Sequence, residues 1–216
     1  MLPAIVYIHG GEWQGGDKGN AIKTLKPFIG EGDYIGFAIN YRLSDETKWP
    51  AQIHDCKAAI RWIKGNADKY GIDKERIGVW GTSAGGHLVA MLALTSVTGE
   101  FEGTVGNYPE ENGSVACAIN GYGPAELLTM EARPGSMRHN VPGSPESRLI
   151  GGNIQDNKEK AINASPVTWV SKKCRPMLIY HGTADSLVIV EQSEALYEQL
   201  KKARAKDIYL INPDPA

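Results

Sequence analysis

Short apolar runs alternate with amphipathic stretches along the 216 residues of the chain. Most of these runs lack polar alternation, a pattern typical of strands that are buried on both faces of a parallel sheet. The runs predict strands at residues 4–8, 34–39, 76–80, 115–119, 176–181 and 207–211. Apolar positions three to four residues apart predict helices at residues 18–30, 50–69, 84–95 and 189–203. Together they predict an α/β fold whose central sheet is open, mostly parallel and flanked by helices in three layers.

The segment 121–166 breaks this alternation. It is rich in Gly, Pro, Ser, Asn and Arg, and it carries only a weak helical pattern at 124–131. A connection of this length inside a compact domain is usually functional or mobile. The whole chain is long enough for one domain with one core. We therefore expect a single domain, residues 1–216, with a cap-like or irregular insertion at about 121–166.

Composition and charge exclude several classes of protein. The net charge is −2 and no long basic run is present, which disfavours nucleic acid as a partner. No apolar run approaches the roughly 18 residues that a membrane span needs. The first eight residues lack the basic start and the cleavage site of a signal peptide. The compartment stays open: cytoplasmic is the default expectation, and secretion the alternative if a targeting signal precedes Met1.

The spacing of possible metal ligands predicts neither a metal nor a cofactor. Cys56, Cys117 and Cys174 are far apart and form no Cys-x-x-Cys pair, so buried thiols are the favoured interpretation, with a single disulfide left open. The chain has no His-x-x-x-His and no carboxylate cluster. Its Gly-x-Ser-x-Gly sequence is not a dinucleotide-binding fingerprint.

The first candidate for chemistry is a serine between a strand and a helix. Strand 76–80 runs into Gly81-Thr82-Ser83-Ala84-Gly85, followed by the apolar helix 84–95. A serine presented at the end of a buried strand needs a very sharp turn, and glycines two residues before and after it remove side chains that would collide there. We predict that Ser83 is a nucleophile. The alternative is a glycine-rich turn on which Ser83 only caps the helix.

The second candidate is a glycine loop after strand 4–8. Its sequence is His9-Gly10-Gly11-Glu12-Trp13. Acyl transfer needs N–H donors aimed at the developing oxyanion, and such a loop can present backbone amides. We predict an oxyanion hole formed by the amides of Gly11, Glu12 and Ala84, with the Glu12 carboxylate solvated. Trp13 either lines the substrate pocket or fixes the loop by packing.

These motifs resemble those of the α/β-hydrolase superfamily, in the esterase/lipase branch around hormone-sensitive-lipase-like and bacterial feruloyl and acetylxylan esterases. They are His9-Gly10-Gly11-Glu12-Trp13, Asn40-Tyr41-Arg42-Leu43, Gly71-Ile72-Asp73, Gly81 to Leu88, and His181-Gly182-Thr183-Ala184-Asp185. The resemblance covers nearly the whole chain. It implies an α/β-hydrolase fold and hydrolysis of small-molecule, short-chain carboxylic esters through an acyl-enzyme. Amide or formamide hydrolysis, as in kynurenine formamidase, and serine peptidase action stay open on the same site.

The resembling architecture orders its triad as Ser, then Asp or Glu, then His. Asp185, on the loop after strand 176–181, is the predicted acid, with a turn or cap aspartate as the alternative. No histidine follows position 181, and His87 and His139 are expected at most as remote substitutes for the base. We expect that the chain is cut at both ends, before two first strands and ahead of the histidine loop. A catalytically impaired hydrolase-like fragment is the alternative.

Strand 34–39 would then be an exposed sheet edge. Such edges invite pairing between chains, so a homodimer through sheet edges is the expected association.

Overall fold

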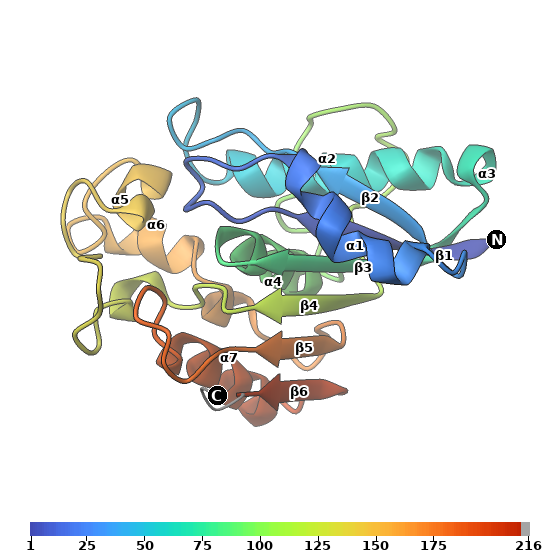
Figure 1. Ribbon diagram of the computed structural model, residues 1–216. Coiled ribbons are helices and arrows are strands. Elements are labelled where there is room, and N and C mark those ends of the chain that lie inside the picture. Colours follow the sequence, from blue (N-terminus) through green and yellow to red (C-terminus); the bar gives the residue numbers. More distant parts are fainter. Residues whose placement is uncertain (213–216) are drawn as a thin grey trace.

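The computed structural model describes residues 1–212, which contain one six-stranded sheet of order β2-β1-β3-β4-β5-β6 (Figure 1). All neighbouring strands are parallel. Their bounds are β1 Leu2–Ile8, β2 Ile35–Ile39, β3 Ile72–Thr82, β4 Cys117–Gly121, β5 Met177–Tyr180 and β6 Ile208–Ile211. The prediction of a parallel α/β sheet is confirmed, with most boundaries shifted by one to four residues. Because all strands run in one direction, their carboxyl ends lie together at the same end of the sheet.

Helices cover both faces of this sheet, which confirms the three-layer arrangement. Helix α1 (Ala21–Ile29) lies on one face, and α2 (Ala51–Gly65), α4 (Ala84–Thr95) and α7 (Glu191–Lys202) lie on the other (Figure 1). The two faces of β1 show the division. Val6 and Ile8 belong to the main core with α4, whereas Tyr7 packs with Ala21 and Leu25 of α1.

Two of the predicted helices are divided into two shorter elements in the structure. The helix predicted at 50–69 ends at Gly65, and Asn66 separates it from the single turn α3 (Ala67–Tyr70). The helix predicted at 18–30 starts with a 3-10 turn, η1 (Lys18–Asn20), and holds Pro27 inside α1. None of the helices described in residues 1–212 is long and apolar enough to cross a membrane.

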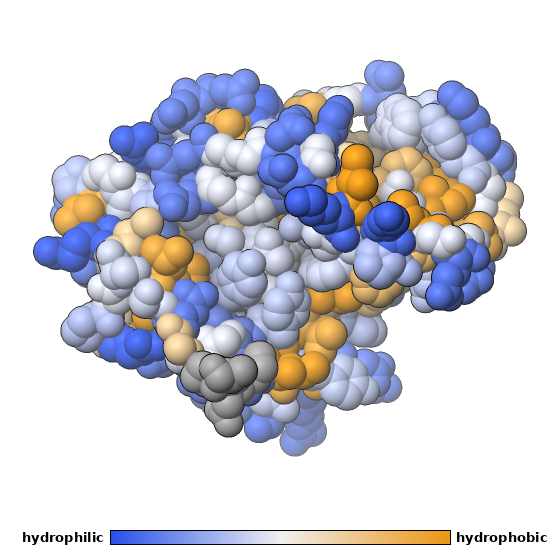
Figure 2. Space-filling model, in the orientation of Figure 1, coloured by the Kyte–Doolittle hydropathy of each residue, from blue (hydrophilic) through white to orange (hydrophobic). Residues whose placement is uncertain are grey.

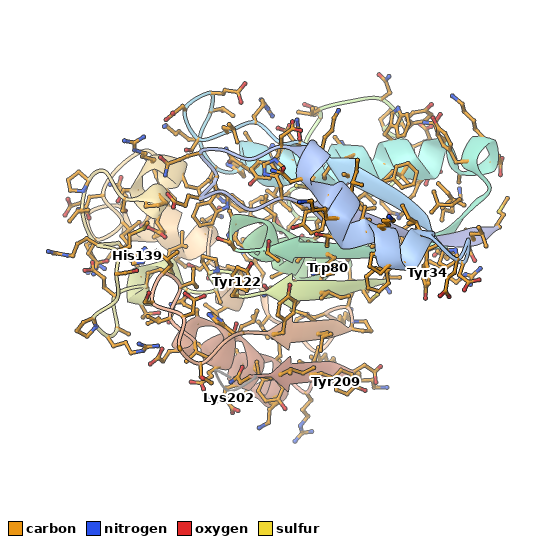
Figure 3. The ribbon with its side chains drawn as sticks, in the orientation of Figure 1. Tyr34, Trp80, Tyr122, His139, Lys202 and Tyr209 are labelled. Carbon is orange, nitrogen blue, oxygen red and sulfur yellow. The ribbon has the colours of Figure 1, made fainter. Side chains whose placement is uncertain are left out.

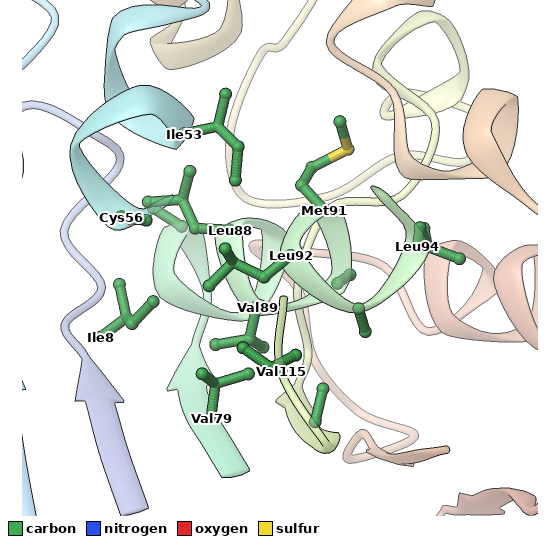
Figure 4. Close-up of a cluster of buried hydrophobic side chains, with 14 of the residues drawn as sticks. Ile8, Ile53, Cys56, Val79, Leu88, Val89, Met91, Leu92, Leu94 and Val115 are labelled. Carbon is green, nitrogen blue, oxygen red and sulfur yellow. The ribbon is translucent and has the colours of Figure 1, made fainter. Parts of the chain in front are cut away.

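Helix α4 is the centre of the core. It spans the residues predicted for it, and each of its twelve residues is buried. Figure 4 shows Leu88 and Leu92 between Ile53 of α2 and Val79 of β3. Burying a leucine side chain contributes about 1.5–3 kcal/mol. The helix has no polar stripe because it has no solvent-facing side. This packing on all sides fixes its N-terminus at the carboxyl end of β3.

The irregular segment 121–166 lies over the carboxyl ends of the strands. It contains η2 (Leu127–Thr129), α5 (Pro145–Ile150) and α6 (Lys158–Asn163) and ends at η3 (Pro166–Trp169), with α5 and α6 beyond the strand ends in Figure 1. The helix predicted at 124–131 is reduced to η2, and α5 and α6 were missed. Six-residue helices are too short to show a period.

The three cysteines are unpaired. Cys56 and Cys174 are buried as predicted, but Cys117, at the start of β4, is exposed, so the expectation of a buried thiol is wrong there.

Candidate active site

Ser83 sits on a strained turn between β3 and α4. Its backbone has φ 56° and ψ −124°, a conformation that non-glycine residues rarely adopt. The Ser83 N–H donates to the Gly121 carbonyl at 2.9 Å, and the Ser83 carbonyl accepts from the His87 N–H at 3.0 Å. The neighbouring strand and the first helical turn therefore hold the strained residue in place.

The flanking glycines are required by backbone packing. A Cβ on Gly85 would collide with the carbonyl oxygens of Ile8 and His9, the latter at 2.7 Å. A Cβ on Gly81 would lie 2.9 Å from the Ile8 oxygen, and one on Gly10 would lie 2.7 Å from the Thr82 oxygen. The loop after β1 and the serine turn thus touch backbone to backbone, as the glycine spacing predicts.

The loop after β1 is wound in the left-handed region over three residues. Gly11, Glu12 and Trp13 have φ of 115°, 58° and 57°. Gln14 and Gly15 donate their N–H groups to the Gly11 carbonyl, at 2.9 and 3.0 Å. Within residues 1–212, the N–H groups of Gly11, Glu12 and Ala84 donate to no acceptor. Three free amide donors therefore lie in the two turns predicted to form the oxyanion hole.

Trp13 fixes this loop to the serine helix. Its side chain is buried, and its indole N–H donates to Nδ1 of His87 at 3.3 Å. Nε2 of His87 bonds to the Ala164 carbonyl at 2.7 Å, so the ring is neutral and donates there. Burial lowers the pKa of His87 to about 4. His87 is the packed residue that the sequence predicts, and both of its nitrogens are engaged.

A small cavity of about 50 Å³ joins these parts. It is lined by Glu12, Trp13, Ser83, Ala84, Pro124, Met137, His139, Pro145, Glu146, Leu187 and Val188. Three of the five predicted site residues, Ser83, Glu12 and Ala84, therefore meet around one space. Trp13 both lines the cavity and fixes the loop, so the two interpretations of this residue hold together.

Asp185 lies on the loop after β5, next to the cavity but not in its wall. Its Oδ1 accepts hydrogen bonds from the N–H groups of Leu187 and Val188, at 2.9 and 3.0 Å. Its Oδ2 lies 3.5 Å from Nε2 of His181. Oδ1 thus stabilises a turn, as the alternative interpretation of Asp185 predicts. Oδ2 takes no part in that turn and faces His181. Both functions fit one carboxylate.

His181 is a structural histidine. Its ring is buried, with Nδ1 2.8 Å from Oγ of Ser193 and Nε2 2.7 Å from the Val188 carbonyl. Burial lowers its pKa, although the Val188 carbonyl and the Asp185 charge oppose this.

The remaining histidines have other partners. Nδ1 of His9 lies 2.8 Å from the Gly10 carbonyl, and the ring stacks on Tyr41 at 4.5 Å. His54 packs against Phe101, away from the serine turn. The histidine expected after strand 207–211 is not among the 216 residues of the chain.

The insertion contributes a pair that the sequence did not reveal. His139 lies beyond the strand ends in Figure 3, and its Nδ1 is 3.0 Å from Oε1 of Glu146. Its Nε2 is 3.0 Å from the Leu187 carbonyl. The sequence offered one unused signal: Ser144 caps α5, Pro145 starts it and Gly151 ends it in the left-handed region. That pattern locates Glu146 on a helix but does not pair it with His139.

Comparisons with known proteins show the family to which the chain belongs. A family model described as BD-FAE matches residues 1–200. The chain belongs to the BD-FAE family. Its fold and its relatives place it in the esterase branch of the α/β-hydrolases. No group of three or more His, Cys, Asp or Glu side chains that could hold a metal ion occurs among residues 1–212.

Two relatives from Mycobacterium tuberculosis (strain ATCC 25618 / H37Rv) show how far the BD-FAE chain extends along longer proteins. It is 31% identical to the probable carboxylic ester hydrolase LipM, over 95% of this chain and 46% of LipM. It is 30% identical to the esterase LipC, over 98% of this chain and 51% of LipC. The chain thus spans about half the length of these curated relatives.

The chain covers a larger share of two similar solved structures than of LipM and LipC. A truncated form of a carbohydrate esterase from gut microbiota superposes with a TM-score of 0.91 at 32% identity, covering 99% of this chain and 77% of that one. The propionate-bound esterase Est2 of Thermogutta terrifontis has a TM-score of 0.78 at 27% identity, covering 100% of this chain and 73% of Est2.

Proposed function

We propose that this BD-FAE chain carries the nucleophile, the oxyanion hole and the acid of a serine esterase for short-chain carboxylic esters. The observation that supports it most is the shared cavity of Ser83, Glu12 and Ala84, because it sets a strained serine beside backbone N–H groups without acceptors. The names of the relatives LipM and LipC, and of Est2, support ester hydrolysis. A cavity of about 50 Å³ favours short acyl chains.

In this mechanism, Oγ of Ser83 attacks the ester carbonyl carbon while its proton passes to a histidine base. The amides of Gly11, Glu12 and Ala84 stabilise the negative oxygen of the tetrahedral intermediate. The intermediate collapses, the base gives its proton to the leaving alcohol, and the acyl group stays on Ser83. A water molecule, deprotonated by the same base, then releases the carboxylic acid.

Asp185 orients that base and stabilises its protonated form. The turn bonds to Leu187 and Val188 engage Oδ1, whereas Oδ2, which lies 3.5 Å from Nε2 of His181, is the oxygen that would face the base. Both ring nitrogens of His87, His139 and His181 are engaged, so none of these accepts the Ser83 proton without breaking a bond.

Removing the histidine base from a serine protease lowers its turnover by about six orders of magnitude. For the 216-residue chain alone, the alternative of an impaired hydrolase predicts such a low rate.

Release of p-nitrophenol from its acetate and butyrate esters tests the proposal. The assay uses this chain and any longer natural protein that contains it. Ser83→Ala is expected to reduce the rate by at least about a thousandfold, because no other group replaces the nucleophile. Ser96→Ala, at the opposite end of α4, is the matched control and keeps the rate. An active protein whose Ser83→Ala variant stays active would show that the assignment is wrong.

A further inference from the structure

The proposed mechanism leaves one buried carboxylate in the cavity wall unused. Glu146, the second residue of α5, is 2% exposed and lines the same cavity as Ser83. Its Oε1 lies 3.0 Å from Nδ1 of His139. Its Oε2 is buried and has no hydrogen-bond partner among the described residues. One half of this carboxylate is therefore satisfied and the other half is not.

His139 does not fill the gap. Its second nitrogen, Nε2, is 3.0 Å from the Leu187 carbonyl, so both ring nitrogens face oxygen acceptors. The ring satisfies both contacts when it carries two protons, as an imidazolium paired with the Glu146 carboxylate. Burial alone would lower the pKa of His139, but the hydrogen bond and charge of Glu146, with the Leu187 hydrogen bond and the Glu131 charge, together raise the pKa.

A buried oxygen without a donor is costly. Leaving a buried polar group unsatisfied costs about 1–3 kcal/mol, and more for a charged one. Glu146 cannot move away without breaking the ion pair with His139, because both side chains are buried. The simplest way to recover this energy is a donor supplied by the molecule that occupies the cavity.

The rest of the wall restricts what that donor is. Besides Glu146, the cavity is lined by Glu12, which is an exposed residue, by Ser83 and by largely apolar residues, and His139 is the only cationic side chain in this wall. Both imidazole N–H groups already have acceptors. Apart from the backbone amides proposed to hold the oxyanion, the side chains of the wall offer acceptors beside Glu146. Next to this carboxylate an anionic group is disfavoured, which favours a neutral hydroxyl group. At about 50 Å³, the cavity holds only a short group close to the reacting carbonyl.

We propose that Glu146 is a specificity-determining residue, whose Oε2 accepts a hydrogen bond from a hydroxyl group on the acyl or alcohol part of the ester. This inference rests on the proposed function, since it concerns the substrate of the same site. It predicts that esters with a hydroxyl a few bonds from the carbonyl bind better than esters of the same size without a donor.

Binding of unreactive ketone analogues tests this inference without turnover. In 5-hydroxypentan-2-one, a methylene replaces the ester oxygen of 2-hydroxyethyl acetate. In 5-fluoropentan-2-one, fluorine replaces the hydroxyl at nearly the same size and donates no hydrogen bond. Dissociation constants from NMR titration of the chain are expected to favour the hydroxy ketone by about tenfold, as a hydrogen bond to a charged group implies.

A charge-removing variant assigns that preference to a residue. Glu146→Gln retains shape and a partner for His139 but places an amide N–H₂ where the free oxygen was, so the preference is expected to fall below about threefold. Glu159→Gln, on exposed α6 outside the cavity, makes the same change and keeps the preference. Backbone NMR spectra report whether each variant is folded.

Three results would overturn the inference. Equal affinities in the wild-type chain would mean that water satisfies Oε2 and the hydroxyl does not replace it. A preference that survives Glu146→Gln would assign it to another group, such as Glu12. No measurable binding of the hydroxy ketone would also contradict it. Because none of these outcomes involves ester cleavage, they are distinct from a failure of Ser83 as the nucleophile.

Discussion

At the scale of single residues, the candidate site depends on close backbone contacts that a side chain at either flanking glycine would block. A non-glycine residue in the conformation of Ser83 costs about 1–3 kcal/mol. Neighbouring backbone compensates for this cost through the bonds of Ser83 to Gly121 and His87. The end of β1 and the loop after it also approach this turn closely, which Gly81 and Gly85 allow because they have no Cβ. The strain of one residue and the absent side chains of two others therefore form one arrangement.

Gly85→Ala tests this arrangement. Within a helix, alanine is favoured over glycine by about 1 kcal/mol, so helix propensity alone predicts stabilisation. A Cβ at Gly85 would instead meet the fixed carbonyl oxygens of Ile8 and His9, and overpacking of this kind costs about 3 kcal/mol or more. We expect net destabilisation of at least about 2 kcal/mol in chemical denaturation.

The matched control is Gly143→Ala. A Cβ on Gly143 would have no atom within 4 Å, and its φ is not positive. We expect a change within about 0.5 kcal/mol. Similar losses of stability in both variants would show that the packing around Gly85 is not the cause.

At the scale of elements, α4 connects the core to the site. Its first residue follows Ser83, and His87 in its first turn binds both Trp13 of the loop after β1 and the Ala164 carbonyl. Charging His87 would break this connection, because an imidazolium has no lone pair for the Trp13 indole. The orientation of the loop therefore depends on a neutral histidine.

This dependence predicts a loss of stability in acid. The folded pKa of His87, about 4, lies below its ordinary value of 6.5, so the unfolded chain binds more protons between these values. The free energy of unfolding is expected to fall as the pH drops from about 6.5 to 4, by up to about 3 kcal/mol from this residue. Chemical denaturation at pH 7, 6, 5 and 4.5 measures the slope.

His87→Gln removes the titrating group, so its slope should be shallower than that of the wild type. Other titrating groups contribute equally to both slopes. Parallel slopes would show that His87 does not contribute to acid sensitivity.

The elements also show what sequence can predict. Helix α4 was located to the residue because its apolar, Gly- and Ala-rich run directly follows the serine turn and stops before the polar Ser96. The serine turn and the loop after β1 were predictable because each follows a strand directly, so local sequence fixes their place. The pair His139 and Glu146 was not, because it depends on how an irregular segment returns over seven residues. No period or motif encodes that path.

At the scale of the whole molecule, the two faces of the sheet are covered unequally. Three long helices pack on one face, whereas α1 alone packs on the other, and Figure 2 shows hydrophobic surface around α1 and along the sheet below it. An apolar groove of about 390 Å³ lies there, with Phe28, Trp80 and Ile119 in its wall. Within residues 1–212, β2 and β6 are the edges of the sheet, and the edge predicted at 34–39 is therefore confirmed.

We propose that this chain associates in solution through its sheet edges. Tyr209 and Ile211 of β6 are 60% and 52% exposed, and exposed apolar edge strands favour pairing between chains. The mass measured by light scattering is expected to rise with protein concentration. Tyr209→Lys combined with Ile211→Lys should return the mass towards 23.4 kDa, because charged side chains oppose edge pairing. A monomer at every concentration would contradict the proposal.

The order of the strands has a consequence for how the chain acquires its site. The two turns that meet at Ser83 follow β1 and β3, which lie side by side with Ile8 opposite Gly81, 73 positions apart in the chain. The ends of a loop of this length meet only at a high entropic cost, and such distant pairings slow folding. The loop after β1 therefore cannot reach Ser83 until β1 has paired with β3. The two turns therefore come together only when the centre of the sheet forms, and the geometry of the candidate site is acquired with it.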